Sequence, residues 1–380
     1  MQKFNLAKLL SAKLTNTLFI FDNPTHSLCS KDVKLIKEKL VELKQANNTI
    51  LLITYNEELT SIVDQTIKLE DQPVKIKHPV YKKLNIPTKL LTATHKKTKK
   101  TLTVKLSKLN LMRGSPENQK TKIAKDILKK NIDHFIRKKL IHSDYIFNGH
   151  TEIGSCLYLD SNHQTQTNRS DIATFLSIAP KLRDFFARLP SAKIAGLQPA
   201  HFSYNHRLGM CKTCRGLGVE KLYINNFEQS SKLCSQCKGL KLNKISNSIT
   251  YKGLSFYEIL SKPVYELKQL LIYEKSIQNS CRLLHDFNLS NLRLSTKLQA
   301  LSSSENDLIY LIDLLKRKKR KSLIILDNIT TSFDNATLNC FLQNIQKLTH
   351  QHHTILLIDQ NPLFLQVKDH IIDGKDFFSS

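Results

Sequence analysis

The chain has 380 residues, of which 41% are hydrophobic, so it is long and apolar enough to build a large packed core. Its 58 lysines and arginines outnumber 32 acidic residues and give a net charge of +26, which favours polyanions such as DNA, RNA or an acidic membrane face. Drift towards lysine codons in an AT-rich coding sequence would produce the same excess without a function. The longest apolar runs, such as LFIF at 18–21, have the length of strands and fall far below the roughly 18 residues of a membrane span. The sequence therefore excludes an integral membrane protein and predicts a cytoplasmic one.

The first 14 residues, MQKFNLAKLLSAKL, contain no acid and have the composition of a targeting helix. Lys8 and Lys13 interrupt the apolar stretch, however, and a strand follows directly. We therefore expect an ordinary amphipathic helix here.

Two blocks of sequence occur twice. Residues 17–32 (TLFIFDNPTHSLCSKD) are similar to 322–337 (SLIILDNITTSFDNAT), and 49–59 (TILLITYNEEL) are similar to 354–364 (TILLIDQNPLF). The spacing is the same for both pairs, since 327 − 22 and 354 − 49 both equal 305. Two matched blocks at one spacing indicate an internal duplication.

Each copy has the pattern of a buried strand that ends in Asp22 or Asp327, a turn, a helix and a second buried strand. Unbroken Leu, Ile and Phe runs are typical of parallel strands that are covered on both faces, and strand–helix–strand units of this kind cross over with a right hand. The sequence thus predicts an α/β fold. Residues 1–70 are expected to be the end of one domain, the lysine-rich and proline-containing segment 71–100 a linker, and 101–380 a second domain.

Two CxxC pairs, Cys211 with Cys214 and Cys234 with Cys237, lie in the second domain. In a reducing compartment, two such knuckles predict one tetrahedral zinc site with a structural role, although a redox pair or idle thiols would leave the same pattern. Glycines after the knuckles permit tight turns, and flanking lysines and arginines favour the thiolate form. The isolated cysteines are expected to be small buried hydrophobes; they are Cys29, Cys156, Cys281 and Cys340.

Three segments carry a family resemblance. The cysteine region 202–260, from FSYNHRLGMCKTC to SFYEIL, resembles the zinc-bearing region in the second nucleotide-binding domain of the UvrA family, the damage-recognition proteins of the ABC excinuclease. Residues 158–175 resemble the stretch between that family's Walker A motif and its zinc module, and 288–306 resemble the run into its ABC signature. The positions retained in the last two segments are Asp160, Thr167, Arg169, Ser170, Ala173, Thr174, Arg293, Leu301, Ser302 and Glu305.

The resemblance implies an ABC-type P-loop ATPase fold with an inserted four-cysteine zinc module at about 150–300. It assigns 1–70 to the C-terminal part of nucleotide-binding domain I and 101–380 to domain II. The duplicated blocks then correspond to the Walker B, D-loop and switch-histidine strands of the two domains. The Walker A and signature motifs of domain I, and the insertions that engage UvrB and damaged DNA, are not expected in this chain, so contact with UvrB through the usual domain is not expected either.

By the same resemblance, GSPENQKT at 114–121 stands where a glycine-rich loop would hold the phosphates of ATP. Gly114, Lys120 and Thr121 are retained there. Side chains that crowd or repel a triphosphate replace the other glycines, and a proline removes one amide; these positions are Glu117, Gln119 and Pro116. Without the resemblance, this string is equally typical of a basic loop before a helix.

The residues that drive hydrolysis in the family have also changed. Asp22 and Asp327 keep the position that faces magnesium, but Asn23 and Asn328 replace the glutamates that follow, and an amide cannot act as a general base for water. Further family positions that have changed are the switch histidines (Tyr55 and Gln360), the signature glycines (Ser303 and Ser304, between the retained Ser302 and Glu305) and a nucleotide-sensing glutamine (Ser161). Efficient ATP hydrolysis is therefore not expected, whereas weak binding of ATP and magnesium stays open.

These patterns favour a UvrA-like DNA-binding protein, related to nucleotide excision repair, with one structural zinc. An alternative is a structural subunit that completes a split UvrA-like protein, with a fragment encoded upstream or with a second copy of the chain. A decaying remnant without function is another alternative. CKTCRGLG also fits the CxxCxGxG repeat of chaperone-type zinc hairpins, but that family has four such knuckles and a J helix, which this sequence lacks.

Overall fold

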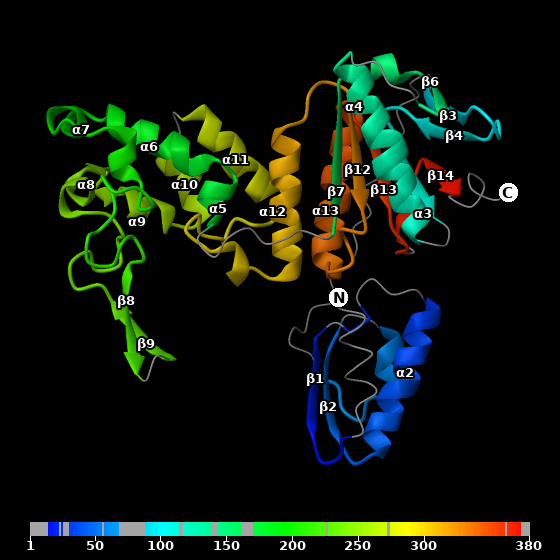
Figure 1. The fold of residues 1–380 in the computed structure, drawn as a ribbon, viewed down its shortest axis with the longest axis horizontal. Coiled ribbons are helices and arrows are strands. Elements are labelled where there is room, and N and C mark those ends of the chain that lie inside the picture. Colours follow the sequence, from blue (N-terminus) through cyan, green and yellow to red (C-terminus); the bar gives the residue numbers. More distant parts are fainter. Residues whose placement is uncertain are drawn as a thin grey trace. The chain divides into compact units, whose positions relative to one another are not determined.

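The structure is a computed structural model of the chain. It describes residues 14–22, 24–25, 30–54, 57–67, 89–113, 117–138, 143–161, 170–224, 227–271, 274–361 and 363–373 (Figure 1). Two compact units emerge, one formed by residues 1–161 with 318–380 and the other by 162–317. Each is described by itself below.

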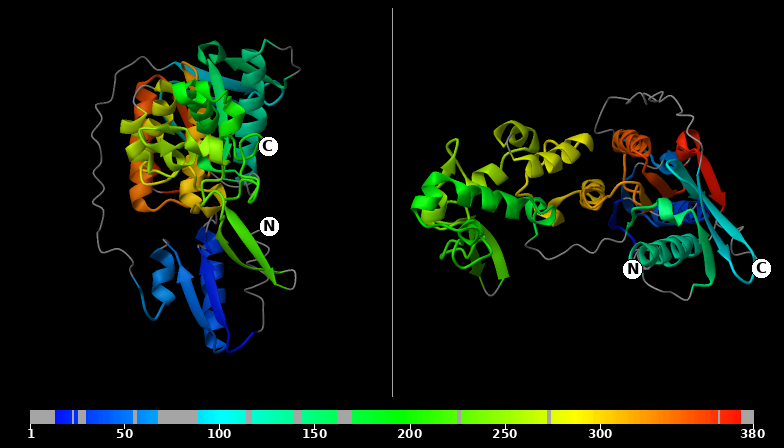
Figure 2. Two further views of the ribbon diagram at one scale, coloured as in Figure 1. Left: turned by 90° about the vertical axis from the view of Figure 1, so that its left-hand side faces the viewer. Right: turned by 90° about the horizontal axis from the view of Figure 1, so that it is seen from above.

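The first copy of the duplicated block forms a parallel strand pair with one helix. Its elements are β1 (Leu18–Asp22), α2 (Ser30–Gln45), β2 (Thr49–Ile53) and the 3-10 helix η1 (Glu57–Ile62). The α2 helix lies against one face of the two strands (Figure 1 and, turned by 90°, Figure 2). A small core fills that face; it consists of Phe19, Phe21, Ile36, Leu40, Leu43 and Leu59.

The second copy repeats this arrangement at the predicted spacing. Its elements are β12 (Ser322–Asp327), α13 (Asn335–His350) and β13 (Thr354–Ile358). Both ends of α13 lie 305 residues after those of α2, because 335 − 30 and 350 − 45 both equal 305. Leu18 pairs with Thr49 in one copy and Leu323 with Thr354 in the other, so the strand register is the same. The predicted duplication and its strand–helix–strand form are confirmed.

One hydrogen bond is conserved between the copies although its side chain differs. In the first copy the amide oxygen of Asn48 accepts from the Thr17 N–H at 3.0 Å. In the second copy Nδ1 of His353 accepts from the Ser322 N–H at 3.1 Å. All four positions obey the offset of 305, since 353 − 48 and 322 − 17 both give that number. The backbone N–H at this position therefore has a side-chain acceptor in both copies, although the two acceptors are different residue types.

The second copy is the centre of a five-stranded parallel sheet of order β14-β5-β13-β12-β7. The other strands are β5 (Leu109–Arg113), β7 (Ser155–Asp160) and β14 (His370–Asp373), and the short helix α14 (Phe364–Val367) precedes β14. A continuous helical segment covers one face; it comprises α3 (Glu117–Lys122), the π-helical turn η2 (Ile123–Lys129) and α4 (Lys130–Ile136). The α/β fold with a parallel sheet is confirmed.

A three-stranded antiparallel sheet of order β4-β3-β6 belongs to the same unit. Its strands are β3 (Leu90–His95), β4 (Thr101–Lys105) and β6 (Tyr145–Asn148), and the 3-10 turn η3 (His150–Glu152) follows. The segment 71–100 was expected to be a linker. Residues 71–88 of it lie outside the described residues, whereas 90–95 form β3, because alternate apolar side chains at Leu91 and Ala93 enter the core. The linker expectation therefore does not hold for these last residues.

The unit of residues 162–317 is mostly helical. It ends at residue 317, beyond the end of the expected insertion at about 150–300. Phe186 lies in its core against Phe202 and Phe256, with ring centroids 5.4 and 5.5 Å away. Its helices are α5 (Ile172–Phe175), α6 (Ile178–Arg188), α7 (Pro190–Ile194), η4 (Pro199–Phe202), α8 (Lys244–Ser248), α9 (Phe256–Leu260), α10 (Val264–Leu270), α11 (Lys275–Asp286), η5 (Leu298–Ala300) and α12 (Ser303–Lys316). Its strands form two hairpins, β8 (Val219–Ile224) with β9 (Phe227–Leu233) and β10 (Thr250–Tyr251) with β11 (Leu254–Ser255).

No helix among the described residues of either unit is long and apolar enough to cross a membrane.

One expectation holds for only one copy of the duplication. Strands β12 and β13 are buried along their whole length, as their apolar runs predict. In β2, however, exposed and partly buried positions alternate, and Leu18 and Ile20 of β1 are exposed. The prediction that the strands of both copies are covered on both faces is thus wrong for the first copy, in which the described helices cover one face only.

Because of its buried histidine, the second copy should be sensitive to acid. Burial lowers the pKa of His353 to about 4, and the positive charges of Lys318 and His352 act in the same direction. The unfolded chain keeps the ordinary histidine pKa near 6.5. Between these values the unfolded state binds a proton that the folded state does not, so the contribution of His353 is fully present above pH 6.5 and is lost as the pH falls towards 4.

The variant His353→Asn places at this position the side chain that the first copy uses. We expect its unfolding free energy to fall by about 1 kcal/mol less than that of the wild type between pH 7.5 and pH 5, as measured by urea unfolding. His285→Asn, at a position of the other unit whose side chain is 59% exposed, is the control and should retain the wild-type slope. Equal slopes for His353→Asn and wild type would contradict the prediction.

Candidate metal centre and nucleotide-binding site

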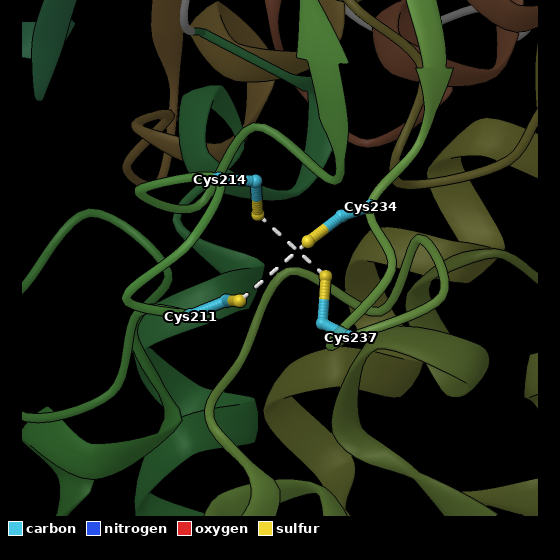
Figure 3. A group of neighbouring side chains, drawn as sticks. All are labelled: Cys211, Cys214, Cys234 and Cys237. Atoms are coloured by element: carbon cyan, nitrogen blue, oxygen red, sulfur yellow. Dashed lines mark hydrogen bonds between the residues drawn. The ribbon is translucent and has the colours of Figure 1, made fainter.

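The four cysteines of the two knuckles meet around one point (Figure 3). Their sulfurs all lie within 4.8 Å of one another, with 3.8 Å between Cys211 and Cys234 and 3.6 Å between Cys214 and Cys237. All four side chains are buried and none forms a disulfide. A tetrahedral ion with bonds of about 2.3 Å needs ligand sulfurs roughly 3.8 Å apart, so the cluster could hold a metal ion of the zinc type.

Each knuckle ends in a turn of the same backbone shape. Arg215 and Gly216 have φ values of 50° and 79°, and Lys238 and Gly239 have 48° and 90°. Two successive left-handed residues reverse the chain directly after the second cysteine of each pair. The two turns are therefore equivalent, and the two knuckles flank the β8–β9 hairpin along the chain.

Backbone amides support the cluster at its base. The Gly218 N–H donates to Sγ of Cys214 at 3.2 Å, and the Cys234 N–H donates to the carbonyl of Gly218 at 3.0 Å. Gly216 has no room for a side chain, because a Cβ there would lie 1.9 Å from the carbonyl oxygen of Tyr204. The glycines of this segment thus fix the sulfur positions as well as the chain reversal.

A buried polar cluster beside the cysteines was not predicted from the sequence. Asp171 accepts from the Thr174 N–H at the start of α5 and from the hydroxyl of Tyr204. The ammonium of Lys241 lies 5.4 Å from the Tyr204 ring and 4.5 Å from the Tyr257 ring. Single residues of these types carry no pattern in the sequence, so only the fold brings them together.

The charge of Lys241 matters for the thiols. Burial lowers its pKa, while negative charge at Asp171, Cys214 and Cys237 acts to raise it. Four thiolates around one divalent cation carry a net charge of −2, which is costly to bury without a counter-charge. With a metal bound, Lys241 would supply part of that counter-charge from within the module.

In the other unit, the predicted phosphate-site residues meet at the carboxyl end of β12. The hydroxyl of Thr121 donates to Oδ2 of Asp327 at 2.7 Å, and the hydroxyl of Tyr158 donates to the same oxygen at 3.0 Å. Lys120 is almost fully buried, and its charge lowers the pKa of Asp327, although burial has the larger effect and raises it overall. Asn328 donates from its amide to the other Asp327 oxygen at 3.1 Å.

A second buried carboxylate, Asp359, faces the same lysine and was missed in the sequence. It follows β13 and accepts from the Thr330 hydroxyl and, at 2.8 Å, from the Asn361 N–H. Burial raises the pKa of Asp359, and the charge of Lys120 acts against this rise. Lys120 thus interacts electrostatically with two carboxyl groups at the place where the resemblance predicts phosphate binding.

Sequence comparison identifies relatives along nearly the whole chain. No family model matches it. The UvrABC system protein A of Chlamydia muridarum is 26% identical over 388 aligned residues, which cover 97% of this chain and 21% of the relative. The protein of the same name from Escherichia coli strain K12 is 24% identical over 98% of this chain and 44% of the relative. The chain is similar to UvrABC system protein A along nearly its whole length.

The fold agrees with this identification. The crystal structure of UvrA2 from Deinococcus radiodurans superimposes with a TM-score of 0.75 over 98% of this chain and 49% of that one, at 18% identity. The resemblance to UvrA that the motifs predict is therefore confirmed. The chain spans less than half the length of the UvrA relatives named above.

The remaining predicted residues are not all part of the site. Ser302 and Glu305 belong to the other unit, where they cap α12: Glu305 accepts from the Ser302 N–H at 2.9 Å and donates its own N–H to the Ser302 hydroxyl at 3.3 Å. Ser161 contacts Asp327 only through its backbone N–H, which donates to the Asp327 carbonyl. Positions outside the described residues or side chains are Asp22, Asn23, Cys29, Tyr55, Gly114, Pro116, Glu117, Thr167 and Arg169.

The close approach at Gly216 gives a test of the knuckle geometry. Gly216→Ala would combine the cost of a left-handed alanine with a backbone clash, and we expect the module to lose about 2–4 kcal/mol of stability. Gly253→Ala is the matched control, because Gly253 has the same φ of +79° but nothing within 4 Å of an added Cβ; about 1 kcal/mol is expected there. Unfolding curves of both variants measure the difference, and equal losses would contradict the role of the Tyr204 carbonyl.

Proposed function

We propose that this protein is a UvrA-like DNA-binding protein, related to nucleotide excision repair, that holds one structural zinc ion and has lost efficient ATP hydrolysis. The observation that carries this proposal is the match to UvrABC system protein A along 97–98% of the chain. The net charge of +26 supports DNA as the partner. Because the chain spans only part of its relatives, these activities are proposed for the chain and are not carried over from them.

The zinc part rests on the geometry of Cys211, Cys214, Cys234 and Cys237, which suits a tetrahedral ion bound by four thiolates. Zinc would hold the two knuckles together and close the base of the β8–β9 hairpin. No reaction step is assigned to it, because a site with four cysteine ligands has no open position for substrate.

We predict about one zinc per chain in protein that is purified without chelator. Cys214→Ser should lose the metal and unfold the module, because a structural zinc contributes roughly 10–16 kcal/mol of coupled binding and folding free energy. Cys340→Ser, which removes a thiol outside the cluster, is the control and should keep the metal. Elemental analysis measures the stoichiometry, and wild-type protein without zinc would refute this part of the proposal.

The loss of hydrolysis rests on the residues that face the Lys120 site. Asn328 stands where the family has its general base, and its amide donates to Asp327, so it does not accept a proton from water. Gln360 stands in place of the switch histidine. Lys120, the residue that would neutralise a β- or γ-phosphate, lies in the field of two buried carboxylates. ATP and magnesium would have to compete with that arrangement.

We predict that ATP turnover by the chain does not exceed that of Lys120→Ala. A sensitive phosphate-release assay with and without duplex DNA measures the rate. Turnover in the wild type that Lys120→Ala removes would show that the site still hydrolyses ATP. Binding of a fluorescent ATP analogue, compared between the same two proteins, separates weak nucleotide binding from turnover.

We propose that the zinc module contacts DNA, because basic side chains are exposed on it. These residues are Arg207, Lys212, Arg215, Lys232, Lys238 and Lys244. In this region the ring of Tyr204 is buried and that of Tyr257 is partly buried, and both lie near Lys241. This favours phosphate contact over base stacking as the mode of binding. Binding of this type has little sequence preference.

We predict that fluorescence anisotropy detects duplex binding that weakens steeply with salt, with a log–log slope of about −0.9 for each phosphate contact. Replacing Lys212, Lys238 and Lys244 by Gln should reduce the slope by about 2–3 and weaken binding at least several-fold. The control replaces the exposed Lys122, Lys125 and Lys130 by Gln, which removes the same charge from the helix over the sheet.

Three outcomes decide the DNA proposal. Salt-sensitive binding that depends on the module lysines supports it, and a duplex with a lesion should bind with nearly the same affinity as an intact one. Absence of binding at low salt refutes it. Equal loss in the control triple variant refutes the placement on the module.

The alternative of a structural subunit that completes a split UvrA-like protein has one observation in its favour, which is the exposed apolar face of β1 and β2.

A further inference from the structure

The duplication permits a comparison of equivalent positions within one molecule. In the second copy, four side chains on one face of β12 and β13 are fully buried; they are Leu323, Ile325, Leu356 and Ile358, each 0% exposed. Their counterparts 305 residues earlier are Leu18, Ile20, Leu51 and Ile53, which are 59%, 61%, 46% and 47% exposed. We call these four residues of the first copy the bare face. The residue types are identical at each of the four positions, and only the cover differs.

The cover of the second copy comes from a contiguous stretch, residues 89–161. Its helical part packs small and aliphatic side chains on the four buried residues; they are Ile123, Ala124, Ile127, Leu128 and Ile132. Its strand β5 pairs with the outer edge of β13, and its strand β7 pairs with the outer edge of β12. Residues 89–161 thus cover one face of the β12–β13 pair and both of its outer edges.

None of these three closures exists in the first copy among the described residues. There β1 and β2 pair only with each other, so both outer edges are open. The opposite face is already filled by α2 and η1. Parallel strands are found with both faces covered, and an apolar face bordered by open strand edges is a typical site of pairing with another chain.

We propose that the bare face and the outer edges of β1 and β2 bind an α/β half-domain, equivalent to residues 89–161, that belongs to a different polypeptide. A strand of that partner would lie parallel to β2, as β5 lies beside β13. Another would lie parallel to β1, as β7 lies beside β12. A helix between them would place Ile, Leu and Ala side chains on the bare face.

A second copy of this chain is the less suitable occupant. Its own residues 89–161 are already paired with its own β12 and β13, and they could bind elsewhere only by leaving that sheet. The proposal gives a surface and an occupant to the hypothesis that the chain completes a split UvrA-like protein. It does not depend on DNA binding, and the DNA measurements cannot decide it.

The experiment uses the full chain with an affinity tag, co-expressed with an untagged polypeptide that copies residues 89–161. This copy is the probe, because it carries the two strands and the helix that close the equivalent surface in the second repeat. We expect recovery of a 1:1 complex. In the complex, the amides of β1 and β2 should gain protection from hydrogen exchange.

The bare-face variant carries Ile20→Lys and Leu51→Lys. Both side chains are exposed in the chain alone, so the variant should fold, with unchanged circular dichroism and zinc content. It should recover the probe at least ten-fold less well than the wild type. Leu35→Lys, at a position of α2 that is 57% exposed, is the control and should bind the probe normally.

Each contrary result overturns the proposal. Failure of the wild-type chain to recover the probe does so. Equal recovery by the bare-face variant does so as well, because the probe would then displace its parent segment in the second copy instead of binding the first. A homodimer of the chain alone, measured by light scattering and broken by the bare-face variant, would assign the face to a second copy.

Discussion

A pair of parallel strands satisfies hydrogen bonds only along the edge that the two strands share, so two faces and two outer edges remain to be closed. This requirement separates the two copies of the duplicated block. In the second copy this requirement is met by helix α13, the α3–α4 segment and strands β5 and β7. The residues at the ends of its strands form a polar site. In the first copy the described helices close one face only, and the described residues leave the other face and both outer edges open. The same local sequence pattern therefore gives a complete sheet in one place and an incomplete one in the other.

The polar site at the end of β12, where the resemblance predicts phosphate binding, shows how the protein satisfies a buried carboxyl group from within. A lysine and a threonine remain beside the strand-end aspartate, but the threonine hydroxyl and Tyr158 now donate to that carboxylate, and Asp359 adds a second negative charge. Buried charges need partners of opposite sign, and here the protein supplies them itself. Once such a network is formed, binding of a triphosphate must break it. In the proposed loss of hydrolysis, these internal bonds would add to the effect of the replaced catalytic groups.

Much of this architecture follows from the sequence. The repeat spacing of 305 residues predicts where α13 begins and ends from the bounds of α2. The two CxxC pairs predict that four sulfurs lie around one point. Both predictions succeed because a repeat and a chelating pair are local sequence patterns, each of which corresponds to one geometry. Other features depend on contacts between distant residues and leave no pattern. The position of Lys241 beside the cysteines and that of Asp359 beside Lys120 are examples. The exposure of Ile20 is another, because it depends on which other residues cover the strand and not on the sequence of the strand. Ser302 and Glu305 show the reverse case, in which a motif of the family also fits an ordinary capping box.

The hairpin between the two knuckles has its ends fixed independently of its length. It begins at Val219, next to the Gly218 amide that donates to Cys214, and it ends at Leu233, next to Cys234. The Cys234 N–H closes this base on the Gly218 carbonyl. The base of the hairpin is closed by these bonds, and the entropic cost of closing a loop grows only slowly with its length. Residues added or removed between β8 and β9 would therefore change the stability of the module little and would leave the cysteine cluster in place. The hairpin is therefore the part of the module in which insertions and deletions can accumulate during evolution, and with them new reach towards a bound polymer.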